Sequence, residues 1–266
     1  MEYLKWYQEE ECLYTKDKKR ISVINLESEN NDSILDEWAT HFRRNYRSLE
    51  DLDFERQGTN LSREEFLRDF VFPDKKVGFG PATRVGDFCE LLIADYIEFI
   101  WEYYVPRTRY CRKINRNSSP QGSDVMGFRI DGKSSLKDEV MIFEVKGTAD
   151  PNAKKEGYQR LQDAIDDSNK DVARFAESLN AIKMRLRDAG EKDRIPIIER
   201  FQNMTDRPYI IKYGASAILT NSKFIADKMV NVTTEEHSYE NILLIVIHNK
   251  DLNMLIDELF RRAEKC

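Results

Sequence analysis

The chain has 266 residues, and its 42 Lys and Arg against 48 Asp and Glu give a formal net charge of -6. This length and apolar content suffice for a buried core, which excludes disorder throughout, and the acidic balance excludes a general attraction to nucleic acid. The four scattered cysteines and the shortness of the longest apolar run, ILLIVI, exclude a disulfide scaffold and a membrane span, so we expect a cytoplasmic protein without a membrane partner.

The first 80 residues predict an N-terminal α+β region. RISVINLES predicts a short strand, and SILDEWATHFRRNY and LSREEFLRDFVF predict helices, the second beginning with a capping-box pattern at Ser62 and Glu65. The following stretch, FPDKKVGFGPATR, concentrates two prolines and two glycines, which favours a boundary. We therefore expect a region over 1–80, a candidate for docking a partner, and a second domain over 81–266.

Residues 84–104 predict an amphipathic helix. Apolar side chains recur there at helical spacing, while Asp87, Asp95 and Glu98 gather on the opposite side. Glu90 departs from this pattern, because it projects inside the apolar arc. A buried acid needs a partner, so Glu90 is a candidate functional residue.

The remaining elements predict a mixed sheet. RTRYCRKI, SDVMGFRI and EVMIFEVKG read as three strands of an antiparallel meander, with the polar loop DGKSSLKD between the last two. A long helix follows to about Asp188, then the strands GASAILT and NILLIVIHN and a closing helix, DLNMLIDELFRRAEK. This order predicts an α/β fold, a mixed central sheet with helices on both faces.

Three charges could meet at the ends of two of these strands. Glu144 and Lys146 share a strand face, and the hairpin would bring Asp124 beside them if the register allows it. Two carboxylates in a poorly solvated place require a proton or a cation, and Mg²⁺ prefers such oxygen ligands. We expect Asp124, Glu144 and the Val145 carbonyl to hold the ion, with Glu90 completing its shell or serving a second ion.

Lys146 would then orient a water molecule or stabilise the charge that develops on a phosphate. A simpler interpretation is that Glu144 and Lys146 form an ordinary salt bridge at a strand end, because Glu-x-Lys often occurs by chance. The coincidence of this pair with Asp124 and with the buried acid Glu90 favours a functional site.

A run of cations without acids precedes the proposed site. It comprises Arg107, Arg109, Arg112, Lys113 and Arg116. This strip could follow a phosphate backbone, as could Lys154 and Lys155 near the start of the long helix. The alternatives are a solvated strand edge for the strip and plain surface lysines for the pair.

The arrangement resembles the PD-(D/E)xK nuclease superfamily, the restriction-endonuclease-like fold with an αβββαβ core. The resemblance covers about residues 82–249 and assigns Asp124, Glu144, Lys146 and Glu90 to the superfamily's catalytic positions, although GSD replaces its Pro-Asp. More narrowly, RVGDFCELLIADYIEF, VPRTRYCRKINRNSSPQGSDVMGF and IFEVKGTA resemble the HamA family, the nuclease subunits of the bacterial Hachiman anti-phage system. That resemblance implies a complex with a helicase partner and DNA degradation triggered by infection.

We therefore expect an Mg²⁺-dependent deoxyribonuclease, with Mn²⁺ able to replace Mg²⁺. Two alternatives stay open. One is a non-catalytic interaction subunit of a helicase complex, and the other is a junction or RNA nuclease on the same scaffold. Dependence of activity on a divalent ion separates the enzymes from the interaction subunit.

Overall fold

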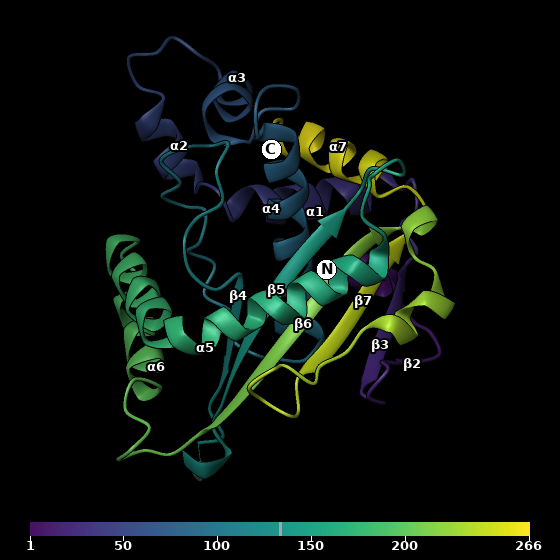
Figure 1. The fold of residues 1–266 in the computed structure, drawn as a ribbon. Helices are drawn as coiled ribbons and strands as arrows, with labels where there is room; N and C mark the ends of the chain where they lie inside the picture. Colours follow the sequence, from purple (N-terminus) through teal and green to yellow (C-terminus); the bar gives the residue numbers. More distant parts are fainter. Residues whose placement is uncertain (133–134) are drawn as a thin grey trace.

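A computed structural model describes residues 1–132 and 135–266, in which a single mixed sheet lies between two layers of helices (Figure 1). Residues 133 and 134, in the predicted loop DGKSSLKD, lie outside the described residues. The strands are β1 (Tyr7–Glu9), β2 (Leu13–Tyr14), β3 (Arg20–Leu26), β4 (Val125–Arg129), β5 (Glu139–Thr148), β6 (Ile210–Thr220) and β7 (Leu243–Asn249). Their spatial order is β1-β3-β7-β6-β5-β4, with β2 also beside β3.

The centre of the sheet is parallel and both of its edges are antiparallel. β3 pairs with β7, β7 with β6, and β6 with β5 in parallel, whereas β4 runs antiparallel to β5 and β1 runs antiparallel to β3. Strands β5, β6 and β7 are buried along most of their length, which explains their nearly continuous apolar sequences. The predicted α/β fold and the strands predicted at β3 to β7 are confirmed.

Helices cover the two faces unequally. The helices α1 (Asp32–Arg44), α4 (Gly80–Asp95) and α7 (Leu252–Ala263) share one hydrophobic core, and the long α5 (Gly157–Asp188) and α6 (Ile195–Arg200) share a second core across the sheet. α2 (Leu49–Glu55) and α3 (Arg63–Phe66) lie beyond α1 and α4 (Figure 1). Short 3-10 helices span Glu2–Trp6, Ser135–Lys137, Lys192–Arg194, Asn221–Lys223 and Ala226–Asn231, and π-helical turns span Leu67–Val71 and Tyr96–Ile100.

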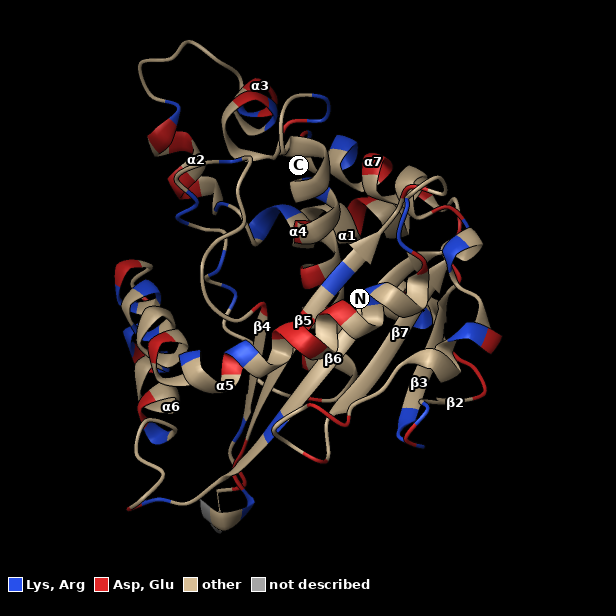
Figure 2. Ribbon diagram, viewed as in Figure 1, with Lys and Arg blue, Asp and Glu red and all other residues tan. Residues whose placement is uncertain are grey.

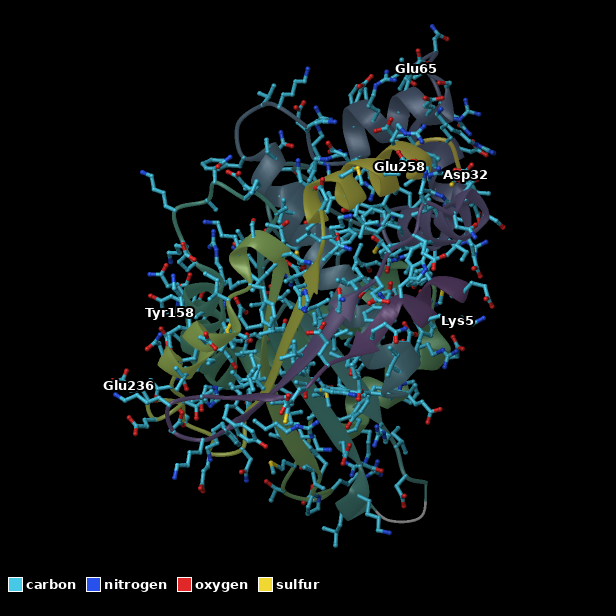
Figure 3. All side chains as sticks on the ribbon, turned by 90° about the vertical axis from the view of Figure 1, so that its right-hand side faces the viewer. Lys5, Asp32, Glu65, Tyr158, Glu236 and Glu258 are labelled. Atoms are coloured by element: carbon cyan, nitrogen blue, oxygen red, sulfur yellow. The ribbon has the colours of Figure 1, made fainter. Side chains whose placement is uncertain are left out.

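The first core continues across residue 80, where α4 begins. Trp38 of α1 packs against Phe88 of α4, and Phe42 packs edge-on against Phe260 of α7. Each such buried aromatic contributes roughly 1.5–3 kcal/mol. In Figure 3, Asp32 of α1 and Glu258 of α7 lie at the same end of the molecule, and both form ion pairs with Arg262. The N-terminal elements thus share the sheet and the core of the later ones.

A close approach of α4 to the sheet sets the position of Glu90. A Cβ atom at Gly147 of β5 would lie 2.5 Å from the Cys89 sulfur. Only glycine therefore allows α4 to pack this closely against the sheet. The contact lies one residue after Lys146 and one residue before Glu90. The packing therefore places both candidate site residues near the same end of β5.

The strand predicted at RTRYCRKI is wrong. Residues 107–114 contain bends, turns and irregular backbone, and the isolated bridge between Tyr104 and Phe128 lies before them. Pro106 removes one backbone donor, and the cations that follow it turn towards acids on several different elements. The predicted three-stranded meander is consequently a two-stranded pair, β4 and β5.

Candidate functional site

Asp124, Glu144 and Lys146 meet where β4 begins and β5 approaches its end. In the register of this pair Val125 faces Phe143, which places Asp124 beside Glu144. Asp124 Oδ2 accepts a hydrogen bond from the Val145 backbone N–H at 3.0 Å, and Lys146 Nζ donates to Glu144 Oε1 at 2.6 Å. The structure therefore brings together the three charges singled out in the sequence.

These side chains belong to the face of the sheet that α5 covers. Glu144 and Lys146 alternate with Phe143 and Val145, whose side chains join the opposite core. Lys146 Nζ also forms an ion pair with Asp167 Oδ2 of α5 at 2.8 Å. Asp167 was missed in the sequence, because helical spacing alone does not show which acid on a long helix faces a strand.

Glu90 lies on the other face and reaches Asp124 only through Arg109. Arg109 Nε donates to Glu90 Oε2 at 2.6 Å, and its Nη2 donates to Asp124 Oδ1 at 2.8 Å. Its Nη1 donates to the carbonyls of Ser123 and Gly122, while the Tyr110 hydroxyl also donates to Glu90. The partner that the buried Glu90 required is therefore an arginine and a tyrosine of the chain itself.

The site holds more negative charge than its cations neutralise. Burial and the nearby Asp124 carboxylate raise the pKa of Glu144 to about 7, against the opposing effect of Lys146. Burial also raises the pKa of Glu90 to about 8, since the attraction of Arg109 is offset by repulsion from Asp124 and Asp87. Burial disfavours the charged form of Lys146, yet Glu144 and Asp167 outweigh it and raise the pKa of that ammonium group.

Helix α5 also holds the segment that carries Asp124. The Ser123 hydroxyl donates to Asp171 Oδ1 at 3.0 Å and lies 3.0 Å from the Ser178 hydroxyl. Burial raises the pKa of Asp171 to about 6, and its Oδ2 has no hydrogen-bond partner within the described ranges. The sequence contained a sign of this cluster, because Asp171 lies beside the apolar positions of the long helix.

Two carboxylates, rather than three, are placed to hold a cation. Across residues 1–132 and 135–266, no group of three or more His, Cys, Asp or Glu side chains is arranged to bind a metal ion. Glu90 is separated from the other acids by Arg109, so the structure does not bring the three predicted carboxylates around one point.

Asp124 and Glu144 nevertheless fit a hard cation that keeps several of its waters. They are close enough for Asp124 to raise the pKa of Glu144, which shows an unrelieved repulsion. The Val145 carbonyl points to the same side of β5 as its N–H, and that N–H is directed at Asp124. The predicted set of Asp124, Glu144 and the Val145 carbonyl is thus arranged along one edge.

A groove of about 1070 Å³ opens over these residues. Its walls include Glu90, Asp124, Glu144 and Lys146, together with one side of α5. Figure 2 shows that α5 carries acidic residues where it crosses β5 and β6, with basic residues to either side. The lining of the groove therefore includes charged side chains of both signs.

Each cation of the predicted basic strip forms an ion pair with an acid of the chain. The pairs are Arg107 with Asp95, Arg109 with Glu90 and Asp124, Arg112 with Asp51, Lys113 with Asp87, and Arg116 with Asp74. Lys154 is exposed, Lys155 pairs with Asp163, and neither borders the groove. The strip therefore has little unpaired charge for a phosphate backbone, although its role in binding stays a prediction.

Two comparisons bear on identity. The family model HamA matches residues 1–263 of the 266-residue chain. No curated protein matches the chain. Within the part of the chain that the structure describes, no helix has the length and apolar character to span a bilayer.

Proposed function

The chain belongs to the HamA family, and on this premise we propose that it is a divalent-metal-dependent DNA nuclease. Membership of the family suggests a role in Hachiman anti-phage defence. The observation that carries the nuclease proposal is the convergence of Asp124, Glu144 and Lys146 on one face of the β4–β5 pair, within a charged groove. An ordinary surface salt bridge would not need a second, half-buried carboxylate beside it.

The residues divide the work of phosphodiester hydrolysis. Asp124, Glu144 and the Val145 carbonyl would hold the cation, which when bound supplies charge neutralisation and activation of water. Lys146, kept protonated by Glu144 and Asp167, donates hydrogen bonds to the oxygen atoms on which negative charge develops. Asp167 orients the ammonium group from α5, and the buried Ser123–Asp171 contact holds the backbone beside Asp124.

The order of elements supports membership of the PD-(D/E)xK superfamily as part of this proposal. α4, β4, β5, α5 and β6 follow one another as in its core, with the acid-bearing helix first and Glu-x-Lys on the strand before the long helix. The departure is the segment before β4, which lacks a strand. The proposal therefore rests on β4 and β5, the two strands that carry the charged residues. Both of these strands are present.

A partner is expected to deliver the DNA. The HamA family implies partnering within a defence system, and we propose that the partner is a helicase subunit. The net charge of -6 gives the free chain no general attraction to DNA, so the free protein would be restrained until a partner presents the substrate.

The test is cleavage of plasmid DNA by the pure protein with Mg²⁺, alone and with a helicase encoded beside it. Glu144→Ala and Lys146→Ala are expected to lower the cleavage rate by roughly 100-fold or more, because each removes a group that acts at the phosphate. Glu139→Gln is the matched control, since Glu139 lies at the other end of β5 and pairs with Lys212. Cleavage by both alanine variants at the wild-type rate would falsify the assignment.

The interaction-subunit alternative is favoured by one observation, the engagement of Asp124 and Glu90 by Arg109. If it is correct, no divalent ion supports cleavage, while the helicase still binds the chain. Parallel reactions with duplex, junction and RNA substrates then separate the deoxyribonuclease from the other nucleases.

A further inference from the structure

One side of α5 presents a row of cations to the groove. Lys170, Arg174 and Arg185 all border it, with Ser178 and Ala181 between them, and the acids Asp167 and Glu177 border it as well. Residues three and four positions apart lie above one another on a helix, so these residues share one side of α5. The row borders the same groove as Asp124 and Glu144, and α5 contacts the segment before Asp124 through Ser123, which meets Asp171 and Ser178.

The charge of this row is less neutralised than that of the predicted strip. Within the described residues, Arg185 has no carboxylate within salt-bridge distance, and its Nη2 reaches only the Gln121 carbonyl at 3.4 Å. Burial and the neighbouring Arg109 cation lower its pKa, which means that Arg185 is held beside a like charge. An anion entering the groove would relieve this repulsion.

Arg174 is similarly available. Its nearest carboxylate oxygen, Asp171 Oδ1, lies 3.7 Å from Nη2, and its Nε donates to the Lys170 backbone carbonyl. The Arg174 side chain is 41% exposed, whereas that of Arg109 is 11% exposed. Lys170 pairs with Asp167 but keeps 65% of its side chain in solvent.

The other groove cations beside the acids are already occupied. Arg109 serves Glu90 and Asp124, and Lys146 serves Glu144 and Asp167. A phosphate that bound to Arg109 or Lys146 would have to displace a carboxylate with which that cation is already paired. The α5 row can instead accept an anion without displacing the ion pairs of Glu90, Asp124 and Glu144.

We propose that Lys170, Arg174 and Arg185 form the phosphate-binding row that holds a nucleic acid strand across the candidate active site. This proposal rests on the proposed nuclease function and names the surface that positions its substrate. From Lys170 to Arg185 the helix rises by roughly 22 Å, at about 1.5 Å per residue. At about 3.4 Å per nucleotide, such a row spans roughly six nucleotides of one strand.

The row explains how an acidic chain can bind DNA locally. Each phosphate contact releases counterions, so the binding constant falls with salt in proportion to the number of contacts. A few contacts on one helix give weak binding by the free protein. A partner that supplies further contacts would then determine the affinity.

The experiment measures binding separately from cleavage. The full chain carrying Lys146→Ala is titrated, in EDTA, into fluorescein-labelled single-stranded and duplex DNA of matched sequence, and anisotropy is followed over a salt series. The test variants are Arg174→Glu with Arg185→Glu, and the milder Arg174→Gln with Arg185→Gln. The control is Arg187→Glu, because Arg187 lies on the same helix, is exposed, and does not border the groove.

We expect the glutamate pair to weaken binding by at least about tenfold, and the glutamine pair to lower the salt slope by about 2, one unit for each lost contact. The Arg187→Glu control should bind as well as its parent. The DNA form whose affinity falls more identifies whether the row holds a single strand or a duplex.

Equal affinities for the parent, the paired variants and the control would overturn the proposal, as would the absence of measurable binding by the parent. Thermal melting of each variant shows that the fold is retained. Because these measurements contain no metal and no cleavage, they stand apart from the nuclease test. A chain that binds DNA through the row but never cleaves it would refute only the proposed function.

Discussion

Two buried acids on α4, Asp95 and Glu90, each face an arginine from the segment after the helix, yet their surroundings differ. Asp95 accepts hydrogen bonds from the Tyr3 hydroxyl at 2.8 Å and from Arg107 at 2.8 Å, and His41 lies 2.9 Å away. Each arginine also serves a second acid, Glu98 for Arg107 and Asp124 for Arg109, but Glu90 has Tyr110 where Asp95 has both Tyr3 and His41.

The difference appears in the protonation of the two acids. Burial disfavours the charged form of Asp95, but Arg107 and the hydrogen bond with His41 outweigh burial, so its pKa is lowered. Burial and repulsion from Asp124 raise the pKa of Glu90 to about 8 in spite of Arg109. Asp95 is therefore a satisfied anion, whereas Glu90 belongs to a cluster in which acids outnumber cations.

This contrast identifies the feature that marks the candidate site. A buried acid paired with an arginine is not sufficient, because Asp95 meets that description and has a structural explanation. The additional feature is that three buried carboxylates, Glu90, Glu144 and Asp171, have raised pKa values near Asp124, whereas near Asp95 the one raised carboxylate among the described residues is Glu98. Three comparisons between the two clusters, and a fourth within the candidate site, test this distinction.

The largest expected effect is on folding. Arg107→Met should lower the free energy of unfolding at neutral pH by about 3–5 kcal/mol, because it leaves Asp95 charged and buried without its cation. Arg109→Met should have a smaller effect, since Glu90 can take up a proton there. Urea denaturation of both variants measures the difference, and a larger loss for Arg109→Met would contradict the distinction.

The second comparison uses a divalent cation. Mg²⁺ or Ca²⁺ at a hundredfold excess over its dissociation constant should stabilise the wild type by about 2.7 kcal/mol. Asp124→Asn should lose this gain, and Asp95→Asn should keep it relative to its own metal-free baseline. Thermal melting with and without the ion measures this stabilisation for each protein. An equal gain in the wild type and both variants would show that the cation does not bind at Asp124.

The third comparison concerns pH. The folded-state pKa of Glu90 is raised, so the stability it confers is complete below its unfolded value near 4.5 and is lost as pH rises towards about 8. Glu90→Gln should therefore flatten the decline in stability between pH 5 and 8, by about 1.4 kcal/mol for each pKa unit removed.

The stability that Asp95 contributes depends on pH with the opposite sign. Its pKa is lowered, so its contribution is present above its unfolded value near 4 and is lost only as pH falls below it. Asp95→Asn should therefore alter the acid limb of the stability profile and leave the shape of the profile between pH 5 and 8 unchanged. Denaturation at a series of pH values gives the stability profile of each variant. If the profiles of Glu90→Gln and Asp95→Asn coincided, the proposed difference between Glu90 and Asp95 would be wrong.

The smallest expected effect is at Asp167, which shares Lys146 with Glu144. Asp167→Asn should lower the Lys146 pKa and shift the alkaline limb of the cleavage profile downwards by less than about one unit, because partly exposed ion pairs contribute only about 0.2–1 kcal/mol. Asp166→Asn is the control, since Asp166 is exposed one residue earlier on α5. Identical profiles for the two variants would assign Asp167 no part in positioning Lys146.

The sequence predicted the parts of the fold that depend on local pattern. The helices α1, α4, α5 and α7 and the strands β3 to β7 follow from periodicity and apolar runs, and the capping box of Ser62 and Glu65 is present. Asp124, Glu144 and Lys146 were found together because strand alternation and a short hairpin restrict where they can lie.

The remainder depends on tertiary contacts that local pattern does not contain. RTRYCRKI has the composition of a strand, but each of its cations reaches a different acid, and those acids are distant in sequence. Nothing in the sequence showed that Arg109 would face inwards, between Glu90 and Asp124. Likewise, the position of α5 across the groove, which brings Asp167 and Arg185 to the site, follows from sheet order.

The parallel pairing of β3 with β7 has a consequence for biosynthesis. Ile21 lies beside Leu244, so one of the earliest segments to leave the ribosome must wait for one of the last before it gains its neighbour. Contacts of such large sequence separation slow folding, and a chain halted before residue 243 leaves β3 as an open edge. A partial chain would accordingly present an unpaired strand edge, which favours association with other chains until β7 is synthesised.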